Sequence, residues 1–355
     1  MRNYKLFSLF GIGLELHWSF LLLVFLLLVL DPSFMLLFLI IFVFVTLHEF
    51  SHSVVASTQG ISVKKIVLLP IGGMAVMDVT DIEPIKELLM AAAGPAFNFV
   101  MMLGLYLVSS SLGLPLMEWF DLFIAGELLD LGRVESVIFY SFWANFILGV
   151  FNFFVPAFPM DGGRIFRSLL AMRFGQLKAT LIARNVSIFI SLLMLVLGFF
   201  GGNLWLVVIG VFLILGSSSE YQSLSVIKAL EGVNAEAIIS IPRVVVGEEE
   251  PIARVLQKMV HYNSTYAVVV GGKRPRVFGL AEAAAVPRVL WQTRSVGSAS
   301  SYVPPAGAGS DLSGIFKRMR SSGLPAVPVL KGGVLVGVVD KFDIDRLLSL
   351  RGAFS

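Results

Sequence analysis

The stretch TLHEFSH, residues 46–52, places a His-Glu-x-x-His pattern inside an apolar run from about Ser33 to Ala56. On a helix, His48 and His52 lie one turn apart, so both imidazoles point the same way. Two neutral imidazoles at this spacing can hold one Zn²⁺, and Glu49 beside them can take a proton from a water at the metal. The pattern therefore predicts a catalytic zinc site on a helix.

The apolar run around this pattern is long enough to cross a bilayer, which needs about 20 residues. An ionisable side chain in the hydrocarbon core costs a few kcal/mol on insertion scales, so His48, Glu49 and His52 together indicate a site. The alternative is a polar face packed inside a helix bundle, and the cost of burying three such groups argues against it.

The composition is that of a membrane protein. Of the 355 residues, 57% are hydrophobic and 14% are charged, which is too apolar for a soluble globular protein. The net charge of +3 could suggest a nucleic-acid partner. However, the basic residues cluster in short loops between apolar runs, a pattern that sets orientation in a membrane. We therefore expect a lipid environment and no nucleic acid.

The chain has no cysteine, so disulfides and thiolate metal ligands are excluded and a metal must be held by His, Asp or Glu. His17 could lie near the site, but we favour an interfacial position beside Trp18. His261 is expected on the surface of a soluble region. No cleavable signal peptide is expected, because the first apolar run lacks a small-residue cleavage site before Asp31.

Six apolar runs are expected to form spanning helices: Ile12–Leu30, Ser33–Ala56, Leu88–Val108, Ser136–Val155, Val186–Phe200 and Asn203–Leu215. The run Val63–Val79 is broken by Pro and Gly and should form strands against the membrane domain. The mixed segment Ser109–Glu135 should lie outside the membrane or at its surface.

The distribution of Lys and Arg predicts the orientation. Six spans put both chain ends on one side, together with the loop that holds Lys64, Lys65 and Lys86 and a basic loop from Arg164 to Arg184. The opposite side holds Arg133 as its only basic residue. We therefore expect a multi-pass protein of the cell membrane with cytoplasmic N- and C-termini.

A catalytic zinc usually takes three protein ligands and leaves one position for water. Asp161 is the best candidate for the third ligand, because it follows an apolar helix and because Gly162 and Gly163 let the backbone turn and approach closely. The alternative is that Asp161 only starts a turn, as Asp often does before Gly. Spacing alone leaves both interpretations open.

From about Ser217 the composition becomes that of a soluble α/β region with an internal repeat of about 60 residues. Each repeat has a helix and two strands, and a Gly-Gly pair makes the turn between the strands. The first repeat comprises Ile252–Tyr262, Ala267–Val270 and Val277–Leu280, and the second Leu312–Ser321, Ala326–Leu330 and Val334–Val339.

The motifs together resemble the site-2 protease family of intramembrane zinc metalloproteases. The resemblance rests on His48-Glu49-x-x-His52, on Asn152 followed by PAFPMDGGR at 156–164, on PIGGMA at 70–75 and on Gly94-Pro95. It implies Zn²⁺ held by His48, His52 and Asp161, with Glu49 as the general base. It also implies that Gly72 and Gly73 belong to an edge strand that receives an unfolded transmembrane protein substrate.

The resemblance is strongest to the archaeal and bacterial branch with a C-terminal pair of CBS domains. It implies an α-helical polytopic membrane domain, with about six transmembrane helices and a short membrane-associated β region, plus an α/β CBS pair. The expected boundaries are 1–219 for the membrane metalloprotease domain, 220–235 for a linker, 236–289 for the first CBS domain and 290–355 for the second.

Asn152 departs from the family pattern, which commonly has Asn three residues before the first Pro of the Asp-Gly motif. Here Asn152 stands four residues before Pro156, and one residue turns a helical side chain by about 100°. A role in positioning substrate or stabilising an oxyanion is therefore open for Asn152. Asn145 and Asn98 are weaker candidates, each equally suited to a helix-packing hydrogen bond.

CBS pairs in relatives bind adenine nucleotides (ATP, ADP or AMP) in the cleft between the domains. The segment GVVDKFD, residues 337–343, resembles the ribose-binding stretch, with Asp343 as its carboxylate. Asp340 replaces the usual Ser or Thr, and the first repeat has no Asp at the matching place. A structural or dimerising role, with a homodimer through the CBS domains, is the alternative.

Two other functions compete with the protease. A CBS-regulated membrane metal-ion transporter would show inverted repeats and a continuous polar path, and neither is visible. A scaffold with a structural zinc would close the site with four ligands, and no fourth candidate is present in the pattern. Hydrolysis of peptide bonds within or near transmembrane segments is the favoured function.

Overall fold

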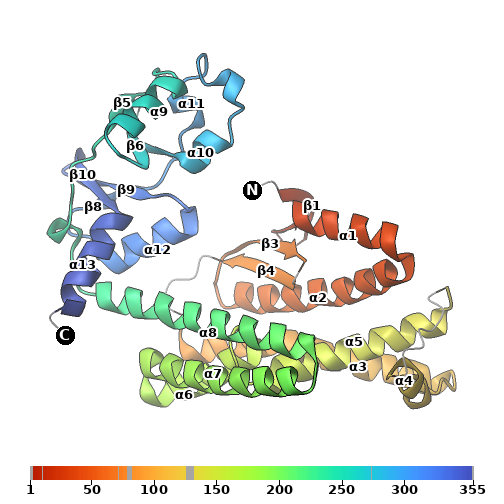
Figure 1. Ribbon diagram of the computed structural model, residues 1–355. Coiled ribbons are helices and arrows are strands. Elements are labelled where there is room, and N and C mark those ends of the chain that lie inside the picture. Colours follow the sequence, from red (N-terminus) through yellow and green to blue (C-terminus); the bar gives the residue numbers. More distant parts are fainter. Residues whose placement is uncertain are drawn as a thin grey trace. The chain divides into compact units, whose positions relative to one another are not determined.

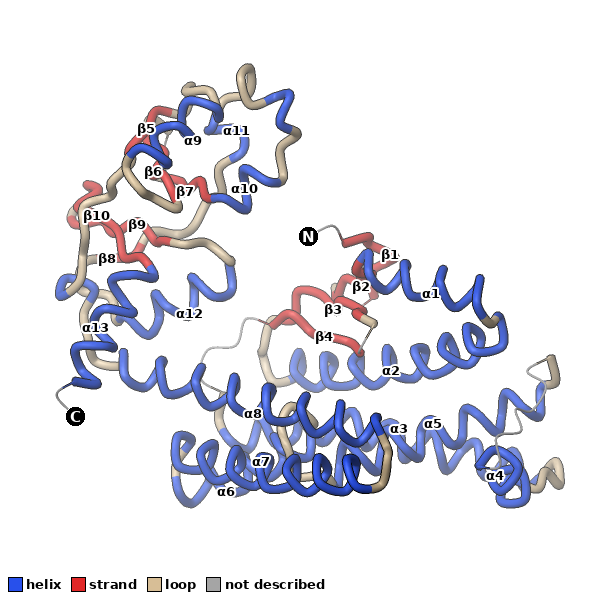
Figure 2. Tube along the Cα trace, in the orientation of Figure 1, coloured by secondary structure: helices blue, strands red, loops and turns tan. Residues whose placement is uncertain are grey.

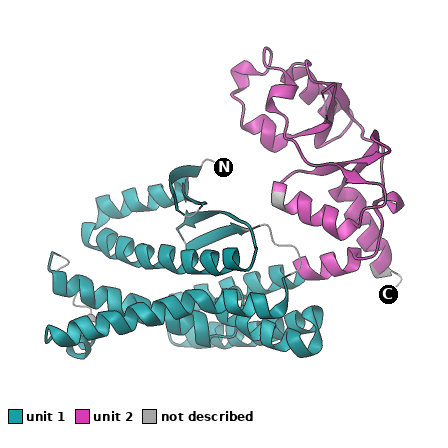
Figure 3. Cartoon of the chain, turned by 180° about the vertical axis from the view of Figure 1, so that it is seen from behind, with its two compact units in different colours: residues 1–222 teal, residues 223–355 magenta. Residues whose placement is uncertain are grey.

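The computed structural model describes residues 3–9, 11–70, 72–77, 82–124, 132–272 and 274–353. The chain divides into two compact units, residues 1–222 and 223–355 (Figure 3). Helix α8 (Leu204–Leu230) runs through this division, so most of the predicted linker 220–235 is helical. The predicted domain boundaries stay predictions.

The first unit begins with a β-hairpin of β1 (Asn3–Leu9) and β2 (Ile12–His17), and the prediction of one spanning helix over Ile12–Leu30 is wrong there. Ile12 and Leu14 are buried on one face of β2, and this alternation has the period of a strand. Helix α1 (Trp18–Leu30) has 13 residues. It measures about 20 Å, against about 30 Å for the hydrocarbon core.

A mixed sheet with the strand order β1-β2-β3-β4 forms the β region of this unit. β2 runs parallel to β3 (Val63–Leu69), which pairs antiparallel with β4 (Gly72–Met77). The strands expected over Val63–Val79 are therefore present, although residues 71 and 78–81 lie outside the described part. The apolar face of the sheet packs on Phe20, Phe42 and Ala56 of α1 and α2.

Within the described residues, five helices are long and apolar enough to cross a membrane. They are α2 (Pro32–Thr58), α3 (Pro84–Ser111), α5 (Val134–Phe154), α7 (Gln176–Phe200) and α8 (Figures 1 and 2). Asp31 separates α1 from α2 and accepts hydrogen bonds from the Ser33 and Phe34 backbone N–H groups, which caps α2. The sheet lies at the end of this hairpin where α1 begins and α2 ends.

The predicted basic loop from Arg164 to Arg184 is wrong, because helix α6 (Asp161–Phe174) and the start of α7 cover it. Arg167 carries part of the positive charge of this segment, but it points into the protein. Its side chain is only 13% exposed and forms ion pairs with Glu87 of α3 and Glu220 of α8. In the mixed segment 109–135, helix α4 (Leu116–Ile124) forms, and residues 125–131 lie outside the described part.

Helix α3 is the centre of the helical bundle, because it packs against α2, α5 and α6. Its buried face includes Ala91, Gly94, Pro95 and Asn98. Small residues on such a face let helices approach closely in a membrane. The bundle therefore brings α2, which carries the His-Glu-x-x-His pattern, near the start of α6.

The second unit contains the predicted repeat. One sheet holds β5 (Val245–Gly247), β6 (Tyr266–Val270) and β7 (Arg276–Gly279), with α9 (Ile252–His261) between β5 and β6. The other holds β8 (Ala306–Gly307), β9 (Ala326–Lys331) and β10 (Val334–Asp340), with α12 (Leu312–Ser322) at the corresponding place. Helices α10 (Leu280–Ala284), α11 (Val296–Ala299) and α13 (Lys341–Ala353) complete the unit.

We expect Arg167→Met to lower the free energy of unfolding of the chain in detergent by about 3–5 kcal/mol, because it leaves the buried Glu87 carboxylate unpaired. The matched control is Lys86→Met, which removes the exposed ion pair with Glu83 and should cost about 0–1 kcal/mol. Thermal unfolding of both variants in one detergent measures the difference. Equal shifts in Tm would contradict the structural role of Arg167.

Candidate metal centre

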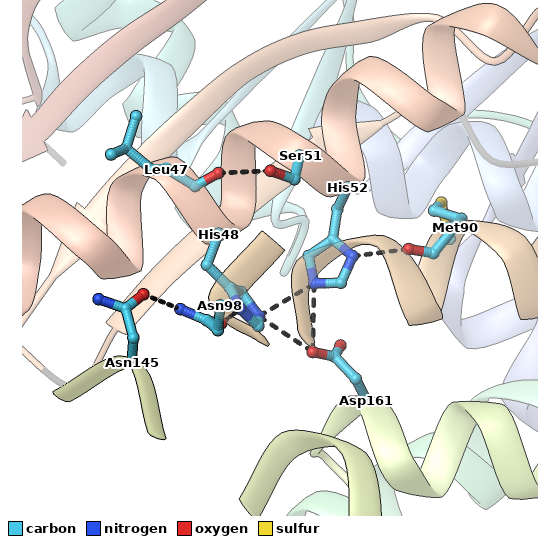
Figure 4. A network of polar contacts seen from close by, with 8 residues as sticks. All are labelled: Leu47, His48, Ser51, His52, Met90, Asn98, Asn145 and Asp161. Carbon is cyan, nitrogen blue, oxygen red and sulfur yellow. Dashed lines mark hydrogen bonds and ion pairs between the residues drawn. The ribbon is translucent and has the colours of Figure 1, made fainter. Parts of the chain in front are cut away.

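Two histidines of α2 form the base of the candidate metal centre (Figure 4). His48 and His52 are buried, with 5% and 7% of their surface exposed, and their Nε2 atoms lie 3.1 Å apart. The helical repeat places both rings on the side of α2 that faces α3, as the His-Glu-x-x-His spacing predicts.

Asp161 supplies the third potential metal-ligand atom. It is the first residue of α6, directly after the bent segment 155–160 that follows α5. Its Oδ2 lies 3.0 Å from His48 Nε2 and 3.1 Å from His52 Nε2. The three residues predicted from separate motifs thus form one cluster of potential metal ligands.

Three glycines make this convergence possible. A Cβ atom on Gly94 of α3 would lie 2.4 Å from His52 Nε2 and 2.6 Å from His48 Nε2. A Cβ atom on Gly162 would lie 2.3 Å from the Val155 carbonyl oxygen, and one on Gly163 would lie 2.6 Å from the Ala157 carbonyl carbon. Real Cβ atoms do not come so close, so the space at the cluster depends on these glycines.

The donor set fits a cation. His52 Nδ1 lies 2.7 Å from the Met90 carbonyl oxygen, which can only accept a hydrogen bond. Nδ1 of the neutral ring therefore carries the proton, and Nε2 presents a lone pair to His48 and Asp161. Lone pairs that face one another across about 3 Å repel unless a cation lies between them.

The distances in the cluster also suit zinc. Tetrahedral sites with ligand bonds of about 2.0–2.1 Å place neighbouring ligand atoms about 3.3 Å apart. The separations of 3.0 to 3.1 Å in the cluster are close to this value. Two imidazoles and one carboxylate are also a ligand set typical of catalytic zinc, which leaves one position open.

Strand β4 passes directly against Glu49. A Cβ atom on Gly73 would lie 2.4 Å from Glu49 Cγ, so a larger residue there would have to displace the Glu49 side chain. Gly72 has a φ of 141°, a conformation that L-residues rarely adopt. The family resemblance implied that Gly72 and Gly73 belong to an edge strand, but it did not indicate that this strand contacts Glu49, because only the tertiary fold brings the two segments together.

Asn98, rather than Asn152, is the asparagine that lies next to the cluster. Asn152 is half-buried on α5, is not in the cluster, and its side chain makes no hydrogen bond to another described residue. Instead, Asn98 Oδ1 faces His48 Nδ1, and Asn98 Nδ2 donates a hydrogen bond to Asn145 Oδ1 at 2.8 Å (Figure 4). The spacing of Gly94 and Asn98, four residues on one helix, is a signal that could have placed Asn98 beside the site.

The other two histidines lie apart from the cluster. His17 is the N-cap of α1, with Nδ1 2.6 Å from Ser19 Oγ and its ring centroid 5.7 Å from that of Trp18. His261 is exposed at the end of α9.

Comparison with known proteins identifies the family of this chain. Residues 36–198 match peptidase family M50. A zinc metalloprotease of Methanocaldococcus jannaschii shares 32% sequence identity with this chain. The match covers 98% of this chain and 96% of that protein. This chain belongs to peptidase family M50. The site-2 protease structure from the same organism shares 34% identity, with a TM-score of 0.46, over 62% of this chain and 95% of that one.

The M50 match confirms the resemblance drawn from the motifs, and it favours a membrane zinc metalloprotease over a metal-ion transporter. For the second unit, the CBS domain of a membrane protein from Sphaerobacter thermophilus covers 37% of this chain and 96% of that structure, with 19% identity and a TM-score of 0.28. The M50 peptidase thus combines a helical membrane unit with a second unit of α/β structure.

We expect Gly94→Ala to weaken zinc binding at least tenfold, because the added methyl group would occupy the space at the two Nε2 atoms. Gly104→Ala on the same helix is the matched control, since a Cβ atom there meets no atom within 4 Å. Zinc content per chain after dialysis against a weak chelator measures the effect. Full zinc content in Gly94→Ala would show that the metal lies elsewhere.

Proposed function

We propose that this M50 peptidase hydrolyses peptide bonds within or near transmembrane segments of membrane proteins. In this proposal His48, His52 and Asp161 hold Zn²⁺, and Glu49 is the general base. The observation that carries it is the convergence of two Nε2 lone pairs and one carboxylate oxygen within 3.1 Å, beside Glu49 and under an edge strand.

Zn²⁺ held by these three residues would act as a Lewis acid, which would polarise the scissile carbonyl group and lower the pKa of a water toward about 7. Glu49 takes a proton from the attacking water and passes it to the leaving amine. Glu49 is half-buried, and its side chain lies against Gly73 of β4.

Strand β4 suits the binding of an unwound substrate. It is an edge of the sheet, so its outer N–H and C=O groups can pair with an added strand. A peptide leaving a spanning helix loses its own hydrogen bonds, which is costly in a membrane unless other partners replace them. Pairing beside Gly73 would hold the substrate next to Glu49.

We propose that both termini are cytoplasmic. The α1–α2 hairpin begins and ends on the side of the sheet, so a short α1 leaves the assignment of sides unchanged. Lys64 and Lys65 on β3 and Arg164 and Arg173 on α6 support this orientation, since basic residues concentrate on the cytoplasmic side.

The second unit offers a cavity of about 400 Å³ for an adenine nucleotide, the ligand proposed for the CBS pair. Ser240, Arg243, Tyr266, Asp340, Asp343 and Arg346 contribute to its lining. Asp343 Oδ2 accepts a hydrogen bond from Ser240 Oγ at 2.7 Å. Burial and the neighbouring Asp340 carboxylate raise the pKa of Asp343, although Ser240 acts in the opposite sense. The two arginines suit phosphate groups and Asp343 a ribose hydroxyl.

We expect Glu49→Gln to retain one zinc per chain and to lose at least about 100-fold in cleavage of a transmembrane substrate, because the amide cannot take the proton. Asp161→Ala should lose both zinc and cleavage. Elemental analysis and a cleavage assay on purified protein in detergent distinguish these outcomes. A Glu49→Gln variant that still cleaves at the wild-type rate would overturn the assignment of the base.

We expect Asp343→Ala to weaken binding of ATP or AMP at least tenfold, since the ribose hydroxyls would lose a charged acceptor. Asp345→Ala, at an exposed position on the same helix, is the control. Calorimetric titration of the full chain with each nucleotide measures the affinities. Equal affinities for both variants and the wild type would remove Asp343 from the site, and no binding to the wild type would favour the dimerising role.

A further inference from the structure

A line of buried amide groups connects the metal centre to the backbone of α5. Asn98 Oδ1 on α3 faces Nδ1 of His48, and Asn98 Nδ2 donates to Asn145 Oδ1 on α5 at 2.8 Å. Asn145 Nδ2 in turn donates to the Ser141 carbonyl oxygen at 2.8 Å. Both asparagines are fully buried, with 0% of their surface exposed.

The direction of every hydrogen bond in this line follows from its last member. A backbone carbonyl can only accept, so Asn145 must present its NH₂ group to Ser141 and its oxygen to Asn98. Asn98 must then present its NH₂ group to Asn145 and its oxygen to His48. The proton of the neutral imidazole therefore belongs on Nδ1 of His48, and Nε2 is left with a lone pair directed at His52 and Asp161.

The second histidine reaches the same state by a shorter route, because His52 Nδ1 faces the Met90 carbonyl directly. His48 has no such direct contact with a carbonyl among the described residues, and two amide side chains replace it. Two fully buried primary amides in a membrane bundle are costly unless their hydrogen bonds are satisfied. Here the two amides bond to each other. Asn98 also faces His48, and Asn145 also donates to the Ser141 carbonyl.

We propose that Asn98 is a positioning residue of the metal centre and that Asn145 sets the orientation of its amide group. Asn98 fixes the tautomer and ring orientation of His48, so that Nε2 is ready to bind a metal. The inference rests on the proposed zinc function of the cluster. It assigns to these two asparagines a role in metal affinity rather than in substrate binding or in helix packing alone.

The experiment measures Zn²⁺ affinity of the full-length protein in detergent by competition with a chromogenic chelator. Asn98→Leu has nearly the same size and removes the acceptor, and it should bind zinc 10- to 100-fold more weakly. Asn98→Asp keeps an acceptor toward His48 Nδ1, and its carboxyl group, when protonated, can still donate to Asn145 Oδ1, so it should stay within about threefold of the wild type. Ser191→Ala, which removes a buried hydroxyl that bonds to Ser187 on α7, is the control and should bind zinc as the wild type does.

The absorption spectrum of the Co²⁺-substituted protein gives a second readout, because its visible bands report ligand geometry. It should change in Asn98→Leu and stay as in the wild type in Asn98→Asp. Equal zinc affinity in Asn98→Leu and the wild type would overturn the inference, and so would equal losses in the Leu and Asp variants, which a packing role would produce.

If Asn98→Leu fails to fold, Asn145→Leu tests the same line with Asn98 intact. It frees the Asn98 amide to rotate and should weaken zinc binding at least threefold, and unchanged affinity in this folded variant would contradict the inference. The outcome for the wild type separates the two proposals. A wild-type chain without zinc would refute the proposed function, whereas wild-type affinity in the asparagine variants would refute only this inference.

Discussion

Repulsion among three electron-rich atoms in an apolar surrounding is the constraint on which the membrane unit depends. Two imidazole nitrogens and a carboxylate oxygen lie within 3.1 Å of one another among spanning helices, where water cannot screen them. A bound cation relieves this repulsion. The surrounding helices must hold the three atoms together before the cation arrives, and most of the unusual features of the unit contribute to this.

Close packing and fixed hydrogen bonds share that task. Gly94 lets α3 approach the two rings, and Gly162 and Gly163 let α6 begin against the segment that follows α5. The Met90 carbonyl and the Asn98 side chain occupy the far nitrogens of the rings, which prevents them from turning. Met90, Gly94 and Asn98 all belong to α3. The buried face of α3 therefore fixes the positions of the two histidine rings of α2.

The sequence predicted much of the site and less of its surroundings. His48 and His52 could be selected because few residue types bind zinc and because helical spacing aligns them, whereas Asp161 was assigned only through the family resemblance, since its spacing also fits an ordinary turn. The repeat in the second unit could be predicted because its strands and helices alternate with clear turn signals. In both cases the information is local, so neighbouring residues suffice to reveal it.

Errors arose where hydrophobicity or charge has two explanations. The apolar run Ile12–Leu30 suggested one spanning helix, but its first six residues form a strand, four of which pair with residues 52 positions further along the chain. The basic residues near Arg167 suggested a loop, but Arg167 points inward to carboxylates from two other helices. Asn98 and Asn145 were ambiguous because their partners lie on different helices. Tertiary contacts of this kind leave no periodic signal in the sequence.

The ion pairs of Arg167 also connect α6 to two other helices, α3 and α8. Asp161 and Arg167 stand six residues apart on this helix, a distance of about 9 Å along its axis. Arg167 bonds to Glu220 of α8, and Glu220 stands just before residue 223, where the second unit begins. Helix α6 therefore connects Asp161 at its start to α8 through the ion pair of Arg167 with Glu220.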